Sequence, residues 1–279
     1  MKKLLMAVIA SAMLLSACGA QDSSSEKAKE NSSEAATTTA PDSSEPEAPK
    51  EPRSVKVMLY GDSITDGFWL EGGYRVTLCN MLEENGYSQY VDFVGKNHSG
   101  ECYDNEHCGF TAFAIDPVPG SESVTGGRSG ISRFAEKILN DYPCDVVALQ
   151  IGTNDVLSLY RLDEIGTRLE NMVDLILSKL PDDGMLYLAT ITCMDANDNT
   201  YIPAEHFTVE FMDKCVDDYN KVIKELVEKK KAEGKNIELA DVASVITKDD
   251  LYDGVHPSEE GYKKMGEFWY NVITDYITK

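Results

Sequence analysis

Three side chains that could together carry out nucleophilic chemistry stand far apart in the sequence. Ser63 follows Gly61 and Asp62, whereas Asp253 and His256 lie three residues apart near the C-terminus. A serine hydroxyl is a weak nucleophile near neutral pH, but an imidazole can take its proton and a carboxylate can orient the imidazole. Singly, each of these residues is also an ordinary turn former. Together they predict a triad in which Ser63 attacks, His256 is the base and Asp253 orients it.

A fourth polar side chain, Asn154, lies just after the apolar run 145–151. Its amide can donate a hydrogen bond to a developing oxyanion, although an Asn at this place can also simply close a turn. The backbone N–H of Ser63 and that of a glycine in the segment 95–130 could complete an oxyanion hole. That segment is rich in Gly and polar residues and has no sustained period, which favours a long functional loop.

The elements that must position these groups alternate between strand and helix. Strands are predicted at 55–59, 90–94, 145–151, 185–190 and 237–242. Helices are predicted at 73–86, 131–140, 162–180 and 207–231, and from the capping residue Ser258 to the C-terminus. The alternation predicts an α/β, three-layer αβα, flavodoxin-like domain with a five-stranded parallel sheet. Ligands of such folds bind beyond the carboxyl ends of the strands, where Ser63, Asn154, Asp253 and His256 are all expected.

The N-terminal part of the chain has a different composition. A basic start and an apolar run at 4–15 lead into Leu15-Ser16-Ala17-Cys18, which resembles the lipobox of bacterial lipoproteins. This interpretation divides the chain into a signal peptide at 1–17, a lipidated disordered linker at 18–52 and a catalytic domain at 53–279, with Cys18 as the lipidation site. An ordinary signal peptide with a coincidental cysteine is the alternative.

The composition excludes some classes of function. The 279 residues carry a formal charge of −22, and clusters of Lys and Arg that could bind phosphates are absent, so no nucleic-acid partner is expected. No cofactor fingerprint is present, and the cysteine spacing predicts no structural zinc. Six cysteines remain after Cys18, and an exported chain permits disulfides among them, with 102 and 108 close enough to close a small loop: Cys79, Cys102, Cys108, Cys144, Cys193 and Cys215.

The residues named above resemble the conserved blocks of the SGNH (GDSL) hydrolase superfamily. The blocks are Gly61-Asp62-Ser63, a loop glycine, Gly152-Thr153-Asn154-Asp155 and Asp253-x-x-His256. The resemblance implies an αβα serine esterase with Ser63 as nucleophile, His256 as base and Asp253 as orienter. It also implies oxyanion donors at Ser63, Asn154 and a block-two glycine. The stretch 106–111 is similar to one in family 3 carbohydrate esterases and points to Gly109, while the stretch around Gly130 fits almost as well.

The same resemblance implies a substrate. A surface-tethered esterase of this type is expected to remove acetyl groups from an O-acetylated polysaccharide such as xylan, on the extracellular face of the membrane. Phe68, Trp69 and Tyr74 could stack on sugar rings, or pack in the core. A lysophospholipase or general lipolytic enzyme is the alternative among esterases. A non-catalytic glycan-binding lipoprotein is the alternative from another class, since a fold alone does not imply a function.

Overall fold

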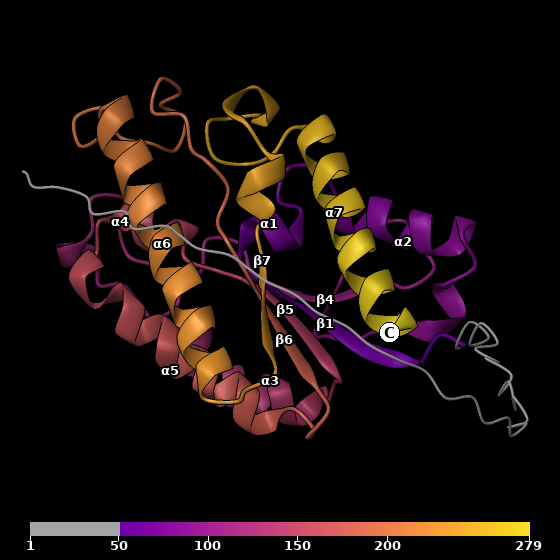
Figure 1. Cartoon of the computed structure of the whole chain (residues 1–279). Helices are drawn as coiled ribbons and strands as arrows, with labels where there is room; N and C mark the ends of the chain where they lie inside the picture. The colour runs from indigo at the N-terminus through magenta and orange to yellow at the C-terminus, as the bar shows by residue number, and fades with distance from the viewer. Residues whose placement is uncertain (1–50) are drawn as a thin grey trace, which may run out of the picture. The chain divides into compact units, whose positions relative to one another are not determined.

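A mostly parallel sheet forms the middle of the described chain, residues 51–279 of a computed structural model (Figure 1). Its five parallel strands are β1 (Val55–Gly61), β2 (Val91–Phe93), β5 (Val146–Gln150), β6 (Met185–Ala189) and β7 (Ile237–Ala240). They pair in the order β2-β1-β5-β6-β7. This is the doubly wound order of flavodoxin-like folds. The predicted α/β fold and its five parallel strands are confirmed.

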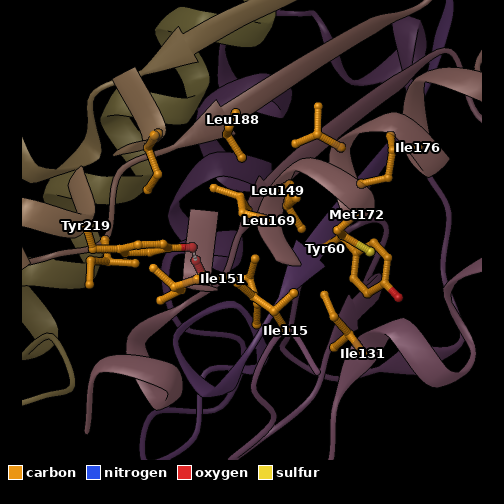
Figure 2. Packing of buried hydrophobic residues seen from close by; sticks show 14 of the residues in the cluster. Tyr60, Ile115, Ile131, Leu149, Ile151, Leu169, Met172, Ile176, Leu188 and Tyr219 are labelled. Atoms are coloured by element: carbon orange, nitrogen blue, oxygen red, sulfur yellow. Dashed lines mark hydrogen bonds between the residues drawn. The ribbon is translucent and has the colours of Figure 1, made fainter. Parts of the chain in front are cut away.

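Helices cover both faces of the sheet. The face packed against α2 (Tyr74–Glu84) and α7 (Glu259–Thr278) holds one buried apolar cluster, which includes Trp269. The other face packs against α3 (Ala135–Asp141), α5 (Ile165–Lys179) and α6 (Val209–Ala232). Figure 2 shows part of this second cluster, where Leu149 and Leu188 of the sheet lie near Leu169 of α5. The sheet is therefore the middle of three layers.

Local sequence accounts for these elements. All five residues of β5 are buried, as expected for a central parallel strand covered on both faces. Helix α6 begins after Thr208, whose hydroxyl accepts the Phe211 N–H, and it ends with three lysines that suit the negative end of the helix dipole. The predicted cap of α7 is confirmed, since the Ser258 hydroxyl accepts the Gly261 N–H at 3.2 Å.

The segment expected to be a long loop contains two further strands. β3 (Asn97–His98) and β4 (Glu106–Gly109) pair antiparallel, and β4 also pairs parallel with the last residues of β1, so the sheet has seven strands. Strands of two and four residues are too short to set up a readable alternation. Two short helices, α1 (Ser63–Asp66) and α4 (Thr153–Ser158), were also not predicted. The 3-10 turns are Ser88–Tyr90, Gly120–Glu122, Ile131–Arg133, Leu162–Glu164, Val242–Val245 and Lys248–Asp250.

The predictions for the N-terminal part of the chain and for the cysteines can be compared with the structure only in part. The predicted leader 1–17, the lipidation site Cys18 and nearly all of the linker 18–52 lie outside them. Within residues 51–279, no helix has the length and apolar character needed to cross a bilayer. The six remaining cysteines are free thiols, so the permitted disulfides are absent from this structure. Cys108 is buried in β4, whereas the thiols of Cys79 and Cys102 both donate to the carbonyl of Asp104, at 3.3 and 3.1 Å.

Candidate active site

Strand β1 delivers Ser63 to the carboxyl edge of the sheet. Gly61 ends the strand, where a β-carbon would lie 2.3 Å from the Gln150 carbonyl oxygen of the neighbouring strand. Asp62 then caps the one-turn helix α1 by accepting the Ile64 N–H at 3.0 Å. Ser63 is the first residue of that helix and is 5% exposed. The Gly-Asp-Ser sequence is therefore a tight turn from strand into helix that fixes the position of the hydroxyl.

The structure brings the three predicted triad residues together. Ser63 Oγ lies 2.9 Å from His256 Nε2. On the other side of the imidazole, His256 Nδ1 lies 2.9 Å from Asp253 Oδ2 and 3.1 Å from Oδ1. All three side chains are buried. The hydroxyl, the imidazole and the carboxylate thus form one continuous hydrogen-bonded series between residues 193 positions apart.

Asp253 is held as an anion by the turn that it begins. Its Oδ1 accepts the backbone N–H groups of Val255 and His256 at 3.1 and 2.8 Å. Burial by itself raises the pKa of Asp253, but the hydrogen bonds from His256 and from these two amides outweigh it and leave the pKa below its ordinary value. An ionised Asp253 assigns the proton to His256 Nδ1, so that the lone pair of Nε2 faces the serine hydroxyl.

Asn154 lies in α4, at the carboxyl end of β5. One hydrogen of its amide is used, because Nδ2 donates to the Phe113 carbonyl at 2.9 Å. A side-chain amide carries two donor hydrogens, so one remains for a ligand. The glycine before α4 is required by packing: Gly152 has a φ of 121°, and a β-carbon there would lie 2.2 Å from the Tyr219 ring. Asn154 and Ser63 both line the same cavity.

Gly109 and Gly130 are the two alternatives for the third donor of the oxyanion hole. Gly109 ends β4 beside Gly61, and its N–H donates to His107 Nδ1 at 3.1 Å. Gly130 is buried against the backbone of Asp116. Neither glycine lines the cavity. The segment that does so follows Gly109 and includes Thr111 and Ala112, where Ala112 has a φ of 65° in the left-handed region.

A buried hydrogen-bond network that the sequence did not predict holds the Gly109 N–H in place. His107 Nε2 lies 3.0 Å from Ser99 Oγ, and burial followed by the charge of Arg75 lowers the pKa of His107 to about 3, so the ring is neutral. Arg75 donates to Ser99 Oγ at 2.7 Å and to the carbonyl of Thr65 in α1 at 2.9 Å. The network therefore joins α2, the β3–β4 pair and the helix that carries Ser63. Arg75 is the one charged residue on the buried, otherwise mostly apolar face of α2, and this could have indicated the network from the sequence.

The cavity at the triad is small and mostly apolar. Its volume is about 200 Å³, below the range of about 300–1,000 Å³ for sites of drug-sized ligands. Phe68 and Tyr201 both line this cavity, and their rings pack edge to face with centroids 6.1 Å apart. The two residues are 44% and 42% exposed. The other predicted aromatic residues pack away from it: Trp69 stacks on Tyr252, and Tyr74 is buried in the core. The arrangement can hold a small acyl group beside two exposed aromatic rings.

A serine, an imidazole and a carboxylate joined in series at the carboxyl edge of a doubly wound sheet define a hydrolase of the SGNH type. The chain belongs to the family described as GDSL-like Lipase/Acylhydrolase, whose sequence pattern matches residues 57–269. This is a family of carboxylic ester hydrolases, as the sequence resemblance implied.

Known relatives point the same way. A "Multidomain esterase" from Ruminococcus flavefaciens is 34% identical over 242 residues, which cover 80% of this chain but 29% of that protein. The structure of a family 3 carbohydrate esterase from Clostridium thermocellum superposes with a TM-score of 0.59 at 27% identity, covering 81% of this chain and all of that one. A family 3 carbohydrate esterase from Talaromyces cellulolyticus shares the fold, with a TM-score of 0.61 at 22% identity, over 80% of this chain and 98% of that one.

Proposed function

We propose that the chain is a serine esterase that removes acetyl groups from an O-acetylated polysaccharide such as xylan. The observation that carries this proposal is the series from Ser63 Oγ to His256 Nε2 at 2.9 Å and from His256 Nδ1 to Asp253 at 2.9 Å. The small cavity favours a substrate with a short acyl group. The exposed rings of Phe68 and Tyr201 favour a sugar as the alcohol part of the ester. The resemblance to family 3 carbohydrate esterases supports a glycan as the substrate.

In the proposed mechanism, His256 Nε2 takes the proton of Ser63 as Oγ attacks the ester carbonyl carbon. The oxyanion that forms accepts hydrogen bonds from the Ser63 N–H and the Asn154 amide. Collapse of this intermediate breaks the bond to the sugar oxygen, which leaves with the proton from His256. Water then attacks the acetyl-serine with His256 again as base, and acetate leaves. Asp253 keeps the imidazole in the required tautomer and stabilises its charged form.

Gly109 is proposed as the third oxyanion donor, on the resemblance alone. Its N–H already donates to His107 Nδ1, so it contributes only if that hydrogen bond is shared with the oxyanion or given up. The chemistry proposed here uses no metal or cofactor.

Acetate release from acetylated xylan, compared with hydrolysis of a short-chain ester and a long-chain lipid ester, tests the function. We expect rapid acetate release and little turnover of the lipid ester. Ser63→Ala should retain its melting temperature and only residual activity. Preferential turnover of the long-chain ester would favour the lipolytic alternative. Binding of the glycan without release of acetate would favour the non-catalytic alternative.

We also propose that the chain is tethered to the outer face of the cell membrane by lipids on Cys18. The lipobox-like sequence at 15–18 supports this. The test is incorporation of labelled palmitate by the full chain in cells, with Cys18→Ala as the matched control. Equal labelling of both would exclude Cys18 as the acylated residue.

A further inference from the structure

Arg128 is a cavity-wall residue to which the proposed mechanism assigns no role. It lies in the segment between β4 and α3, and it lines the same cavity as Ser63 and His256. Its side chain is half-buried, and its Nη2 donates to Thr125 Oγ1 at 3.0 Å. Its Nε is buried and, within residues 51–279, has no hydrogen-bond partner. The guanidinium of a residue that lines the same cavity as the nucleophile thus has donors without a partner among the described residues.

Within residues 51–279 no ion pair neutralises the charge on Arg128. Burial lowers the pKa of Arg128, and the negative charge of Asp62 offsets part of this effect. No carboxylate of the described chain lies within ion-pair distance of it, although the full sequence has a net charge of −22. By contrast, Arg161 pairs with Glu122 at 3.0 Å and Arg168 with Asp155 at 3.2 Å. A partly desolvated cation without a partner costs free energy. None of the residues that line the cavity is acidic; the nearby carboxylates of Asp62 and Asp253 belong to the turns that carry Ser63 and His256.

Holding the loop in place does not account for this side chain. The backbone of Arg128 already fixes the segment, because its N–H and C=O both bond to Val118, at 2.9 and 3.0 Å. The Thr125 hydroxyl has other neighbours, since it also lies 3.3 Å from Ser158 Oγ. The feature that requires an explanation is a cationic side chain, only partly hydrogen-bonded, among the residues that line the cavity.

We propose that Arg128 is a carboxylate-binding subsite, so that the preferred substrates are acetyl esters on glycans that carry uronic acids. This inference rests on the proposed esterase function. The planar guanidinium matches the geometry of a carboxylate and binds it through two parallel hydrogen bonds. A uronate held in this way places a hydroxyl-borne acetyl group of the same or the adjacent sugar at Ser63.

The test compares two esters that differ only in charge. Acetate release is measured from methyl O-acetyl-glucuronoside and from its C6 carboxamide, with the wild-type chain, Arg128→Gln, Arg128→Lys and the exposed control Arg133→Gln. We expect kcat/KM of the wild type to favour the acid by about 10- to 100-fold, the size of a charge-assisted pair. Arg128→Gln should reduce the ratio to near one, Arg128→Lys should retain part of it, and Arg133→Gln should leave it unchanged.

Three outcomes of this comparison of the acid with its carboxamide overturn the inference. The first is a wild-type ratio near one, and the second is an unchanged ratio in Arg128→Gln. The third is an equal reduction of kcat/KM on both esters in Arg128→Gln, which would mean that Arg128 acts on the reacting carbonyl group. A preference for a succinyl ester of methyl glucoside over the acetyl-uronoside would overturn the uronate assignment and place the carboxylate on the acyl group.

A failure of the esterase function itself remains distinguishable. If no ester is cleaved, calorimetric binding of methyl glucuronoside and its carboxamide to the wild type and Arg128→Gln still tests the subsite. We expect weaker binding of the acid to Arg128→Gln, and equal binding of the acid to both proteins overturns the inference. Equal melting temperatures of the two proteins exclude misfolding as the cause of a loss.

Discussion

Asn154 is the residue whose role can be separated most cleanly from folding. If its free amide hydrogen binds the oxyanion, Asn154→Ala should reduce kcat by about 10²- to 10³-fold, the usual effect of one lost oxyanion donor. Its other hydrogen bond, to the Phe113 carbonyl at 2.9 Å, is structural. Measurement of kcat, KM and the melting temperature separates the two effects. A lower melting temperature with an unchanged kcat would contradict the catalytic role.

The imidazole of His256 sets the expected pH dependence of activity. Protonation of Nε2 removes the acceptor that lies 2.9 Å from Ser63 Oγ, so kcat/KM should fall as the pH is lowered from about 8 to 5. Asp253 remains ionised in this range, because its pKa lies below the ordinary value of 3.8. The measurement is a pH–rate profile with a small acetyl ester. A flat profile over this range would exclude His256 as the base.

At the scale of the element, the junction of β4 with α1 leaves no room for a side chain at Gly109. A β-carbon on Gly109 would lie 2.3 Å from the Asp66 nitrogen and 2.6 Å from its Cα, both backbone atoms. Gly109→Ala must therefore separate the strand from the helix that carries Ser63. We expect it to lower the free energy of unfolding by about 1–3 kcal/mol, as overpacking does, and to reduce activity with it. Denaturant unfolding monitored alongside esterase assays measures both.

The control for that substitution is a glycine that has space for a β-carbon. A β-carbon on Gly166 in α5 would meet only Val222 Cγ1, at 3.2 Å, and alanine is a better helix former than glycine by up to about 1 kcal/mol. Gly166→Ala should therefore leave stability and activity close to wild type. Equal stability of Gly109→Ala and the wild type would show that the close approach of β4 to α1 is not required.

At the scale of the whole molecule, buried acids and net charge predict greater stability at mildly acidic pH. Burial raises the pKa of Asp62 and of Asp155 from the ordinary 3.8 to about 6, because their hydrogen bonds and neighbouring positive charges offset only part of the cost. Such groups bind more protons in the folded chain. Their contribution to stability is greatest below the unfolded pKa and is lost as the pH rises through about 6. Protonation also reduces repulsion within a chain of charge −22.

We therefore expect the melting temperature to rise by on the order of 5 °C between pH 8 and about pH 5.5. Below about pH 4 the trend should reverse, since the pKa values of Asp250 and Asp253 are lowered in the folded chain and their contributions are lost on protonation. Asp62→Asn keeps an oxygen acceptor for the Ile64 N–H and removes the titration, so it should reduce the pH dependence. Scanning calorimetry at several pH values checks this. A melting temperature that falls steadily from pH 8 to 5.5 would contradict it.

The sequence by itself determined the order of the main elements and which residues are proposed as the triad. Apolar periodicity identified β1 and β5, and residues at the carboxyl ends of parallel strands must meet on one edge, so Ser63, Asn154 and His256 could be expected together. Those signals are local: the period of a strand, a capping serine, a glycine in a turn. They need no knowledge of what packs against them.

Only the tertiary structure decided how the loops complete the site. Trp69 and Phe68 are adjacent aromatic residues, yet Trp69 packs on Tyr252 while Phe68 joins Tyr201 from the β6–α6 connection at the cavity. β4 exists because it pairs with the end of β1, and the Gly109 N–H is directed to His107 by a buried network that includes Arg75. Contacts between segments far apart in the chain set these positions, and they leave no period in the sequence.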